Sequence, residues 1–330
     1  MKALLLDSPG APDTLRVGVV ETPHPEPGEV RVKVQAAGLN PADYKLMANG
    51  VSSWLYPFIP GLDVAGVIDE VGEGVDEWNI GDAVFYHGNY AQPGGFAEFA
   101  VTTVRTLVRI PKHLSAVDAA AYPCAGFTAF QALVEKLNIM SGQSILVQGG
   151  AGGVGGYAIQ IAAKTGLEVI TTASSCNSDW TKSLGASWNI DYNTESIPER
   201  IHQITNGRGV DAIIDTVGME TATKGLDLLA YNGAIACTAQ LPDLEKFRQL
   251  GQALSVHEIN LGGAYRSGSM MAIDRLGLTG RSFAEFIGSM TIKSMVTEVI
   301  SLEQIPDALN RLSRRNVRGK IVAVLQSSIS

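Results

Sequence analysis

The feature that most constrains this sequence is a glycine-rich turn, GGAGGVG, between an apolar run and an amphipathic segment. The run at 144–150 (SILVQGG) is typical of a buried strand, and residues 153–165 repeat apolar side chains at helical spacing. Gly150, Gly152 and Gly155 fit the pattern G-x-G-x-x-G, which becomes specific when a strand precedes it and a helix follows. We therefore predict a dinucleotide site, with a pyrophosphate at the helix N-terminus, in preference to a plain tight turn.

The cofactor predicted from this region is NADPH. An NAD site usually carries an acidic residue about 20 positions beyond the glycines, where it binds the ribose 2′-hydroxyl. Residues 172–175 are Thr-Ala-Ser-Ser, so the window holds hydroxyls and no carboxylate that would repel a 2′-phosphate. The window also lacks an arginine, which leaves the choice between NADP and NAD open.

Outside this turn, the order of strand and helix patterns predicts an α/β protein with two domains. Residues 1–119 contain closely spaced strand patterns punctuated by glycine and proline, which favours a compact β-barrel. A helical segment at 115–139 leads into residues 120–265, where strands then alternate with helices, as in a doubly wound parallel sheet. Residues 266–330, with a helix at 303–314 and a strand at 320–326, are expected to return to the first domain.

Composition excludes several classes of partner. The net charge of −8, without a long basic run, argues against nucleic-acid binding. No apolar run reaches the roughly 20 residues of a membrane helix. The three cysteines form no C-x-x-C pair, and an odd count argues against a disulfide framework. We expect a cytoplasmic protein that acts on a small-molecule substrate.

Several segments together resemble one known family. These are AAGLNPADYK, IPGLDVAGVIDEVGEGV, GDAVFYHG, GGFAEFAV, AGFTAFQAL, GGAGGVGGYAIQIAAKTG, SLGA and RGKIVAVL. In this order they are similar to medium-chain dehydrogenase/reductases, most of all to the zinc-independent quinone oxidoreductase branch. The resemblance implies an N-terminal GroES-like β-barrel domain, a Rossmann domain and a cleft between them.

The resemblance also bears on zinc. Zinc-dependent relatives bind catalytic zinc with Cys, His and Cys, and the matching positions here are Asn40, Leu62 and Cys124. Leucine cannot coordinate a metal, and the stretch between Gly81 and Phe99 lacks the four cysteines of a structural-zinc lobe. We therefore expect no metal, and hydride delivery to a quinone or an α,β-unsaturated carbonyl instead of alcohol oxidation, which needs a Lewis acid.

The candidate catalytic residues lie in NPADYK, at the family's active-site loop. Tyr44 can donate its phenol to a developing oxyanion, Lys45 can supply positive charge, and Asn40 can contact the nicotinamide ribose or the substrate. A structural interpretation remains open for Asn40 and Asp43, because Asn is a good helix N-cap with Pro41 after it. Lys45 can also be merely solvated.

The candidate cofactor-binding residues combine the glycine turn with the ends of the predicted strands, which face the crevice in an open α/β sheet. They are Thr128, Gly150, Ala151, Gly152, Gly153, Val154, Gly155, Ser174, Asn177, Tyr192, Val217, Gly218, Thr238, Gln240, Gly263, Tyr265 and Lys320. The five histidines show no paired spacing, so none is included.

Two other functions stay open at this point. One is a 2-enoyl-thioester reductase that uses the same cleft, and the other is an NADPH-binding sensor with little turnover, since a fold does not guarantee catalysis. Relatives often dimerise through the edge strand of the Rossmann sheet, so the resemblance implies a homodimer paired through residues 258–265.

Overall fold

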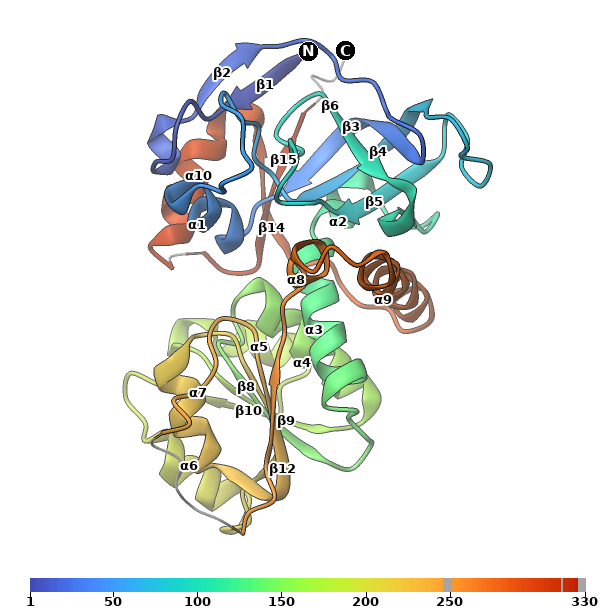
Figure 1. Cartoon of the computed structure of the whole chain (residues 1–330). Helices are drawn as coiled ribbons and strands as arrows, with labels where there is room; N and C mark the ends of the chain where they lie inside the picture. Colours follow the sequence, from blue (N-terminus) through green and yellow to red (C-terminus); the bar gives the residue numbers. More distant parts are fainter. Residues whose placement is uncertain (246–250, 316, 326–330) are drawn as a thin grey trace. The chain divides into compact units, whose positions relative to one another are not determined.

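The computed structural model describes residues 1–245, 251–315 and 317–325, which form two compact units (Figure 1). The first unit combines Met1–Phe127 with Leu261–Ser330, and the second is Thr128–Asn260. The chain thus enters the second unit once, leaves it once, and places both of its ends in the first unit. No helix in the described residues is long and apolar enough to cross a membrane.

The first unit is built on a seven-stranded sheet with the order β14-β15-β3-β4-β5-β7, in which β6 also pairs with β3. Neighbouring strands run antiparallel except β14 and β15, which are parallel. A separate pair, β1 and β2, is also antiparallel. The strands are β1 (Lys2–Leu5), β2 (Arg16–Val19), β3 (Glu29–Gly38), β4 (Asp63–Val71), β5 (Ala83–His87), β6 (Phe99–Thr103), β7 (Val108–Arg109), β14 (Val296–Ser301) and β15 (Lys320–Val324).

The central strand β3 shows why this segment folds as it does. Val30, Val32 and Val34 are fully buried, whereas Arg31 between them is partly buried and Lys33 is exposed. This alternation places the valines in a core with residues of β4, β5 and β6, and on the other face Arg31 pairs with Asp69 while Lys33 lies in solvent.

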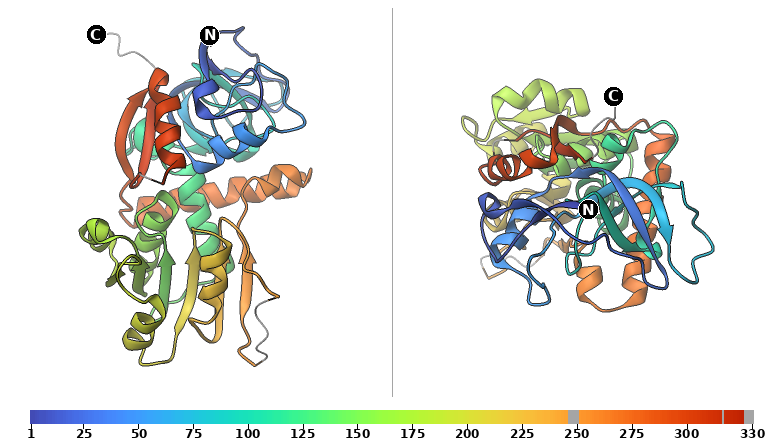
Figure 2. Two further views of the ribbon diagram at one scale, coloured as in Figure 1. Left: turned by 90° about the vertical axis from the view of Figure 1, so that its left-hand side faces the viewer. Right: turned by 90° about the horizontal axis from the view of Figure 1, so that it is seen from above.

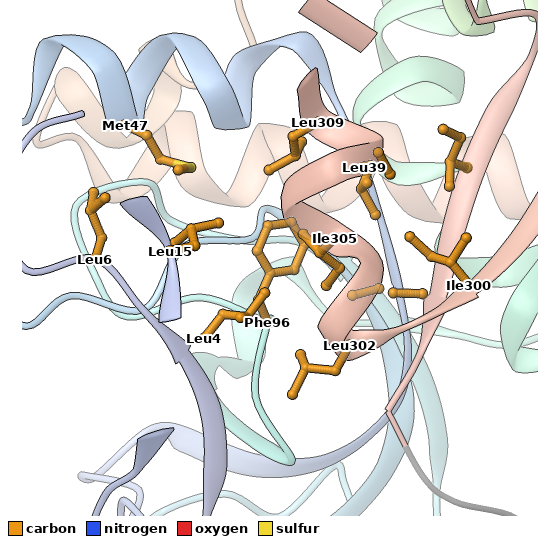
Figure 3. Close-up of a cluster of buried hydrophobic side chains, with 14 of the residues drawn as sticks. Leu4, Leu6, Leu15, Leu39, Met47, Phe96, Ile300, Leu302, Ile305 and Leu309 are labelled. Atoms are coloured by element: carbon orange, nitrogen blue, oxygen red, sulfur yellow. The ribbon is translucent and has the colours of Figure 1, made fainter. Parts of the chain in front are cut away.

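A second core joins the two ends of the chain. Its apolar side chains come from the first hundred residues and from residues 300–323, and Figure 3 shows Met47 of α1 and Leu309 of α10 near Leu6, Phe96 and Ile305. In Figure 2 the C-terminal segment, in red, carries its strands beside its helix. The helices of this unit are α1 (Pro41–Asn49), α2 (Ala116–Ala120), the π-helical η3 (Pro123–Phe127), α8 (Gly263–Arg266), α9 (Met270–Ser289) and α10 (Ile305–Ser313), with short 3₁₀ turns η1 (Pro12–Thr14), η2 (Val104–Thr106) and η6 (Leu302–Gln304).

The second unit contains a six-stranded parallel sheet with the order β10-β9-β8-β11-β12-β13. Numbered from its first strand, the order is 3-2-1-4-5-6, which is the doubly wound Rossmann arrangement. The strands are β8 (Ser144–Gln148), β9 (Glu168–Thr172), β10 (Trp188–Ile190), β11 (Val210–Asp215), β12 (Leu229–Cys237) and β13 (Ser255–Glu258). Because all of them are parallel, their carboxyl ends share one edge of the sheet.

The helices of the second unit begin with α3 (Thr128–Phe130) and the π-helical η4 (Gln131–Lys136), which precede β8. Those that connect the strands are α4 (Gly153–Thr165), the 3₁₀ turn η5 (Ser175–Asn177), α5 (Ser178–Leu184), α6 (Ile197–Ile204) and α7 (Met219–Leu226). Helix α4 buries Tyr157, Ala158, Ile161 and Ala162, and its C-cap is Gly166, whose φ of 89° is the left-handed conformation that glycine favours.

The structure corrects the predicted strand at 258–265. Strand β13 ends at Glu258, opposite Cys237 at the end of β12, so no partner extends the ladder further. Gly263 instead begins helix α8. The predicted helix at 115–139 is interrupted by π-helical turns, and helix α9 was not predicted. The predicted strand at 320–326 is observed as Lys320–Val324, and residue 326 lies outside the described residues.

Candidate functional site

The glycine turn between β8 and α4 is shaped by close packing at two of its three motif positions. A Cβ on Gly155 would lie 2.3 Å from the carbonyl oxygen of Gly149, and a Cβ on Gly150 would lie 2.0 Å from Oγ1 of Thr171. At Gly152, by contrast, the nearest atom to an added Cβ is 3.7 Å away. Packing within the protein does not require glycine at residue 152, so a cradle remains open at the start of α4, where backbone N–H groups lack partners from a preceding helical turn.

This geometry fits a dinucleotide cofactor. Gly152 is the N-cap of α4, and Ala151, Gly153 and Val154 are partly exposed around it, so a pyrophosphate can approach the backbone. Thr128 begins α3, which packs against α4, and its side chain is buried.

Polar groups gather at the carboxyl end of β9, where the adenosine ribose of a Rossmann cofactor is bound. The amide of Asn177 donates to Oγ of Ser174 at 3.1 Å, and the exposed Tyr192 follows β10 nearby in the sequence. The carboxylate of Asp191 accepts the backbone N–H groups of Ser175 and Asn193, both at 3.0 Å. Sequence inspection overlooked Asp191, since it follows β10 and not β9. These hydrogen bonds tie the loop after β10 to the loop after β9.

The ends of β11 and β12 supply the other predicted cofactor residues. The carboxylate of Asp215 accepts the N–H groups of Val217 at 3.1 Å and Gly218 at 2.9 Å. Thr238 donates its hydroxyl to the carbonyl of Asp215 at 3.2 Å, and the side-chain oxygen of Gln240 accepts from the N–H of Met219 at 3.4 Å. These contacts bring both loops to the carboxyl edge of the sheet that also carries the glycine turn.

In the first unit, polar residues from adjacent strands form a row at one end of the sheet. Gly38 at the end of β3 pairs with Asp63 at the start of β4, and Asp63 pairs with His87 at the end of β5. On the other side, β15 pairs with β3 so that Val322 faces Gly38, and the same register brings Lys320 beside Asn40.

Lys320 and Asp63 form a buried ion pair at the centre of this row. They are 4% and 0% exposed, and Nζ of Lys320 lies 3.1 Å from Oδ2 of Asp63. The same ammonium donates to the carbonyl of Leu39 at 3.0 Å and to Oδ1 of Asn40. Asp63 also accepts from the Asn40 amide and from the N–H of Cys124, both at 2.8 Å. All three hydrogens of the ammonium are used within the first unit.

The start of helix α1 adds a second buried carboxylate. Asp43 accepts the backbone N–H of Asn40 at 2.7 Å and that of Leu62 at 3.2 Å. Burial raises the pKa of Asp43 to about 7, and the negative charge of Asp63 contributes to the same increase. Asn40 occupies the N-cap position of α1 and forms a capping box with Asp43, which bears out the structural interpretation of these two residues. Its side-chain amide also bonds Asp63 and Lys320.

Asp63, His87 and Cys124 each place one potential ligand atom within 4.8 Å of the others, which invites comparison with a metal centre. The remaining contacts do not fit a resident ion. Both oxygens of Asp63 are already bonded, one of them to an ammonium. Burial of the Cys124 thiol raises its pKa, and the Asp63 carboxylate raises it further, so the thiol holds its proton.

Among the described residues, His87 is the member of this cluster that sequence reasoning missed. It is 4% exposed, and its Nδ1 has no hydrogen-bond partner in the part of the chain that the structure describes. Tyr265, predicted to touch cofactor, donates its hydroxyl to the carbonyl of His87 at 2.6 Å, and Gly263 begins the helix that carries it. The antiparallel pairing of β4 with β5 is the signal that would have placed His87 opposite Asp63.

A small depression lies beside this row in the first unit. Its walls include Asp43, Trp54, Phe58 and Tyr90, and the rings of Trp54 and Phe58 stack with centroids 3.9 Å apart. Tyr44, next to Asp43 in α1, is partly exposed, and Lys45 is exposed.

Comparisons with known proteins agree with this architecture. The alcohol dehydrogenase GroES-like domain family matches residues 26–112, and the zinc-binding dehydrogenase family matches residues 153–276. The quinone oxidoreductase of Homo sapiens is 32% identical over 240 residues, which cover 71% of this chain and 72% of the human protein. The chain belongs to the medium-chain dehydrogenase/reductase family, in its quinone oxidoreductase-like branch.

Other members extend the likeness. The chloroplast envelope quinone oxidoreductase homolog of Arabidopsis thaliana is 38% identical over 204 residues, and the match covers 59% of this chain and 61% of that protein. The solved quinone oxidoreductase of Coxiella burnetii superposes with a TM-score of 0.82 at 29% identity, covering 99% of both chains. The predicted pairing of a GroES-like domain with a Rossmann domain is thereby confirmed, and the relatives indicate an oxidoreductase that uses a nicotinamide cofactor.

Proposed function

We propose that this protein is an NADPH-dependent reductase that acts on a quinone or an α,β-unsaturated carbonyl compound without a metal ion. The observation that carries this proposal is the open cradle at Gly152. Its neighbours Gly150 and Gly155 must be glycine because of close packing, whereas Gly152 is not constrained in this way. An oxidoreductase with a nicotinamide cofactor is the activity that the relatives' names indicate.

When bound, the reduced nicotinamide supplies the hydride. The residues of this chain bind the cofactor and orient the substrate beside it. The turn at Gly150–Gly155 holds the pyrophosphate through backbone N–H groups. Ser174 and Asn177, which are already bonded to each other, offer polar groups to a ribose 2′-phosphate, and Tyr192 borders the same end. Val217, Gly218, Thr238 and Gln240 line the carboxyl edge of the sheet toward the nicotinamide.

In the first unit, Tyr44 is the proposed hydrogen-bond and proton donor to the substrate oxygen as negative charge develops there. Lys45 adds positive charge from the exposed side of α1. Asn40 and Lys320 act as positioning residues, since their polar atoms are bonded to each other and to Asp63. The stacked Trp54 and Phe58, with Tyr90, line the adjacent depression, and a planar quinone or enone would lie against this aromatic side of the first unit.

A matched pair of assays tests this proposal. Loss of NADPH absorbance is followed with a panel of quinones, short enones and a 2-enoyl thioester, each with NADH in parallel. Turnover with a quinone or enone supports the reductase, whereas turnover with the thioester alone favours the thioester reductase. Tight NADPH binding without turnover on any substrate favours the sensor and contradicts the proposal.

The role of Tyr44 has its own test. Tyr44→Phe removes the phenol hydroxyl while keeping the ring, so we expect kcat to fall about 100-fold, the lower end of a general-acid contribution, with NADPH affinity unchanged. A Tyr231→Phe variant, at an exposed tyrosine of β12 to which no role is assigned, is the matched control and is expected to retain kcat. Equal kcat in the Tyr44 variant and the parent would exclude Tyr44 as the donor.

We further propose a cytoplasmic homodimer. Strand β13 pairs with β12 on one side and lies at the edge of the described sheet, where a second copy can add. Light scattering of a Val256→Pro variant tests this: a shift from dimer to monomer supports the proposal, and an unchanged dimer contradicts this interface.

A further inference from the structure

The cluster of Asp63, His87 and Cys124 has the donor set of a transition-metal site, yet a protein cation is bonded to it. One oxygen, one nitrogen and one sulfur lie within 4.8 Å of one another. In a tetrahedral zinc site, metal–ligand bonds of 2.0–2.3 Å place donors roughly 3.5 Å apart. Modest side-chain rotation would therefore bring these three groups around one ion.

His87 adds a buried imidazole nitrogen to the cluster. Its side chain is 4% exposed, and Nδ1 has no hydrogen-bond partner in the described residues. A buried polar atom normally has a partner, and a neutral imidazole nitrogen is among the commonest metal ligands. The cluster thus contains an uncommitted nitrogen beside a carboxylate and a thiol.

The cation already present is the ammonium of Lys320. It lies 3.1 Å from Oδ2 of Asp63, and Asn40 and Leu39 accept its other hydrogens. A divalent ion bound to Asp63 would lie within a few ångströms of this ammonium in a buried environment, where like charges repel strongly.

We infer that Lys320 is the resident cation of this cluster and that it excludes divalent metal ions of the zinc type from Asp63, His87 and Cys124. Lys320 supplies the positive charge that Asp63 needs and fixes the carboxylate toward Asn40. The ion pair of Lys320 with Asp63 explains how a member of a family described as zinc-binding can lack the metal. The inference does not depend on the proposed substrate, because metal binding is measured without cofactor or substrate.

The experiment is a cobalt titration of the full-length protein, with zinc content measured in parallel. Co²⁺ bound by thiolate gives a charge-transfer absorption that reports Cys124 directly. For Lys320→Met we expect one equivalent of Co²⁺ and a Kd at least about 100-fold lower than that of the parent protein, from the loss of one nearby positive charge. Adding Cys124→Ser should abolish the charge-transfer band, and adding His87→Gln should weaken binding.

Two further variants keep the test decisive. Lys320→Gln retains hydrogen-bond donors without the charge, so it covers the case in which Lys320→Met does not fold without metal. Lys33→Met removes an exposed lysine of β3 and should leave metal binding as weak as in the parent. Stoichiometric Co²⁺ or Zn²⁺ on Cys124 in the parent would overturn the inference. So would folded Lys320→Met and Lys320→Gln proteins that bind metal no better than the parent.

Discussion

The two units stabilise a fully buried carboxylate in different ways. Asp63 in the first unit is paired with the ammonium of Lys320, which is 257 positions away in the sequence. Asp215 in the second unit accepts the backbone N–H groups of Val217 and Gly218, two and three positions away. One region therefore depends on side chains that only the folded sheet brings together, and the other depends on local backbone geometry. Disrupting each region requires a different kind of substitution.

The largest effect is expected when the buried ion pair is broken. Lys320→Met leaves Asp63 as an uncompensated buried charge, and we expect the free energy of unfolding to fall by about 3–5 kcal/mol in metal-free buffer. Urea unfolding followed by circular dichroism measures this change. The double variant Asp63→Asn with Lys320→Met should recover part of the loss, because it removes both charges.

An exposed lysine of the same sheet provides the control. Lys33→Met should change the free energy of unfolding by less than about 0.5 kcal/mol, as is usual for surface substitutions. If Lys320→Met lowered the free energy of unfolding no more than Lys33→Met does, the ion pair would not be needed to stabilise the buried carboxylate of the first unit.

A smaller effect is expected from the backbone of the second unit. Gly155→Ala forces a methyl group to within 2.3 Å of the Gly149 carbonyl oxygen. Overpacking of this kind typically costs about 1–3 kcal/mol, and urea unfolding would detect it. Because α4 would shift, NADPH binding should weaken in the same variant.

Gly152→Ala is the matched substitution in the same turn. The nearest atom to its added Cβ is 3.7 Å away, so the free energy of unfolding should stay within about 0.5 kcal/mol. The methyl group would nevertheless occupy the cradle, and we expect the Kd for NADPH to rise about tenfold, equivalent to about 1.4 kcal/mol. A fluorescence titration that showed unchanged affinity would mean that the cofactor does not approach this face.

The difference between local backbone contacts in the second unit and long-range side-chain contacts in the first also explains what could be predicted from the sequence. The helix at 153–165 was predicted with the bounds that α4 has, because glycine turns and apolar periodicity are local signals. The strand predicted at 258–265 was wrong, since the length of β13 is set by the end of its neighbour β12. The prediction of the glycine turn needed no knowledge of distant residues.

The polar row of the first unit could not be predicted in the same way. Asp63 and His87 face each other only through the register of β4 and β5, and Lys320 joins them through the pairing of β15 with β3. The sequence showed that Cys124 matches a zinc-ligand position of the relatives. Its proximity to His87 could not be predicted, because it depends on where η3 lies over the sheet. Sequence patterns give the strands but not their register, so a histidine without a paired partner in sequence was set aside.

The two units are also expected to differ in how their stability depends on pH. Burial, reinforced by the charge of Asp63 and opposed by that of Lys320, raises the pKa of Asp43 to about 7. The unfolded chain returns this group to its ordinary pKa of 3.8, so the folded state binds the extra proton between these values. The stability from protonated Asp43 is complete below about 3.8 and is lost as pH rises through about 7.

The pKa of Asp191 in the second unit is shifted in the opposite direction, so its contribution to stability depends on pH in the opposite way. Hydrogen bonds from the Asn193 and Ser175 backbone lower its pKa, so its contribution is present above 3.8 and is lost as pH falls below that value. Between pH 5 and 8, Asp43→Asn should flatten the decline of the free energy of unfolding with pH, whereas Asp191→Asn should leave that slope unchanged and alter only the acid limb. Urea unfolding at a series of pH values measures both slopes. An equal slope in the parent and Asp43→Asn proteins would show that Asp43 is ionised throughout, and that Lys320 compensates both carboxylates of the first unit.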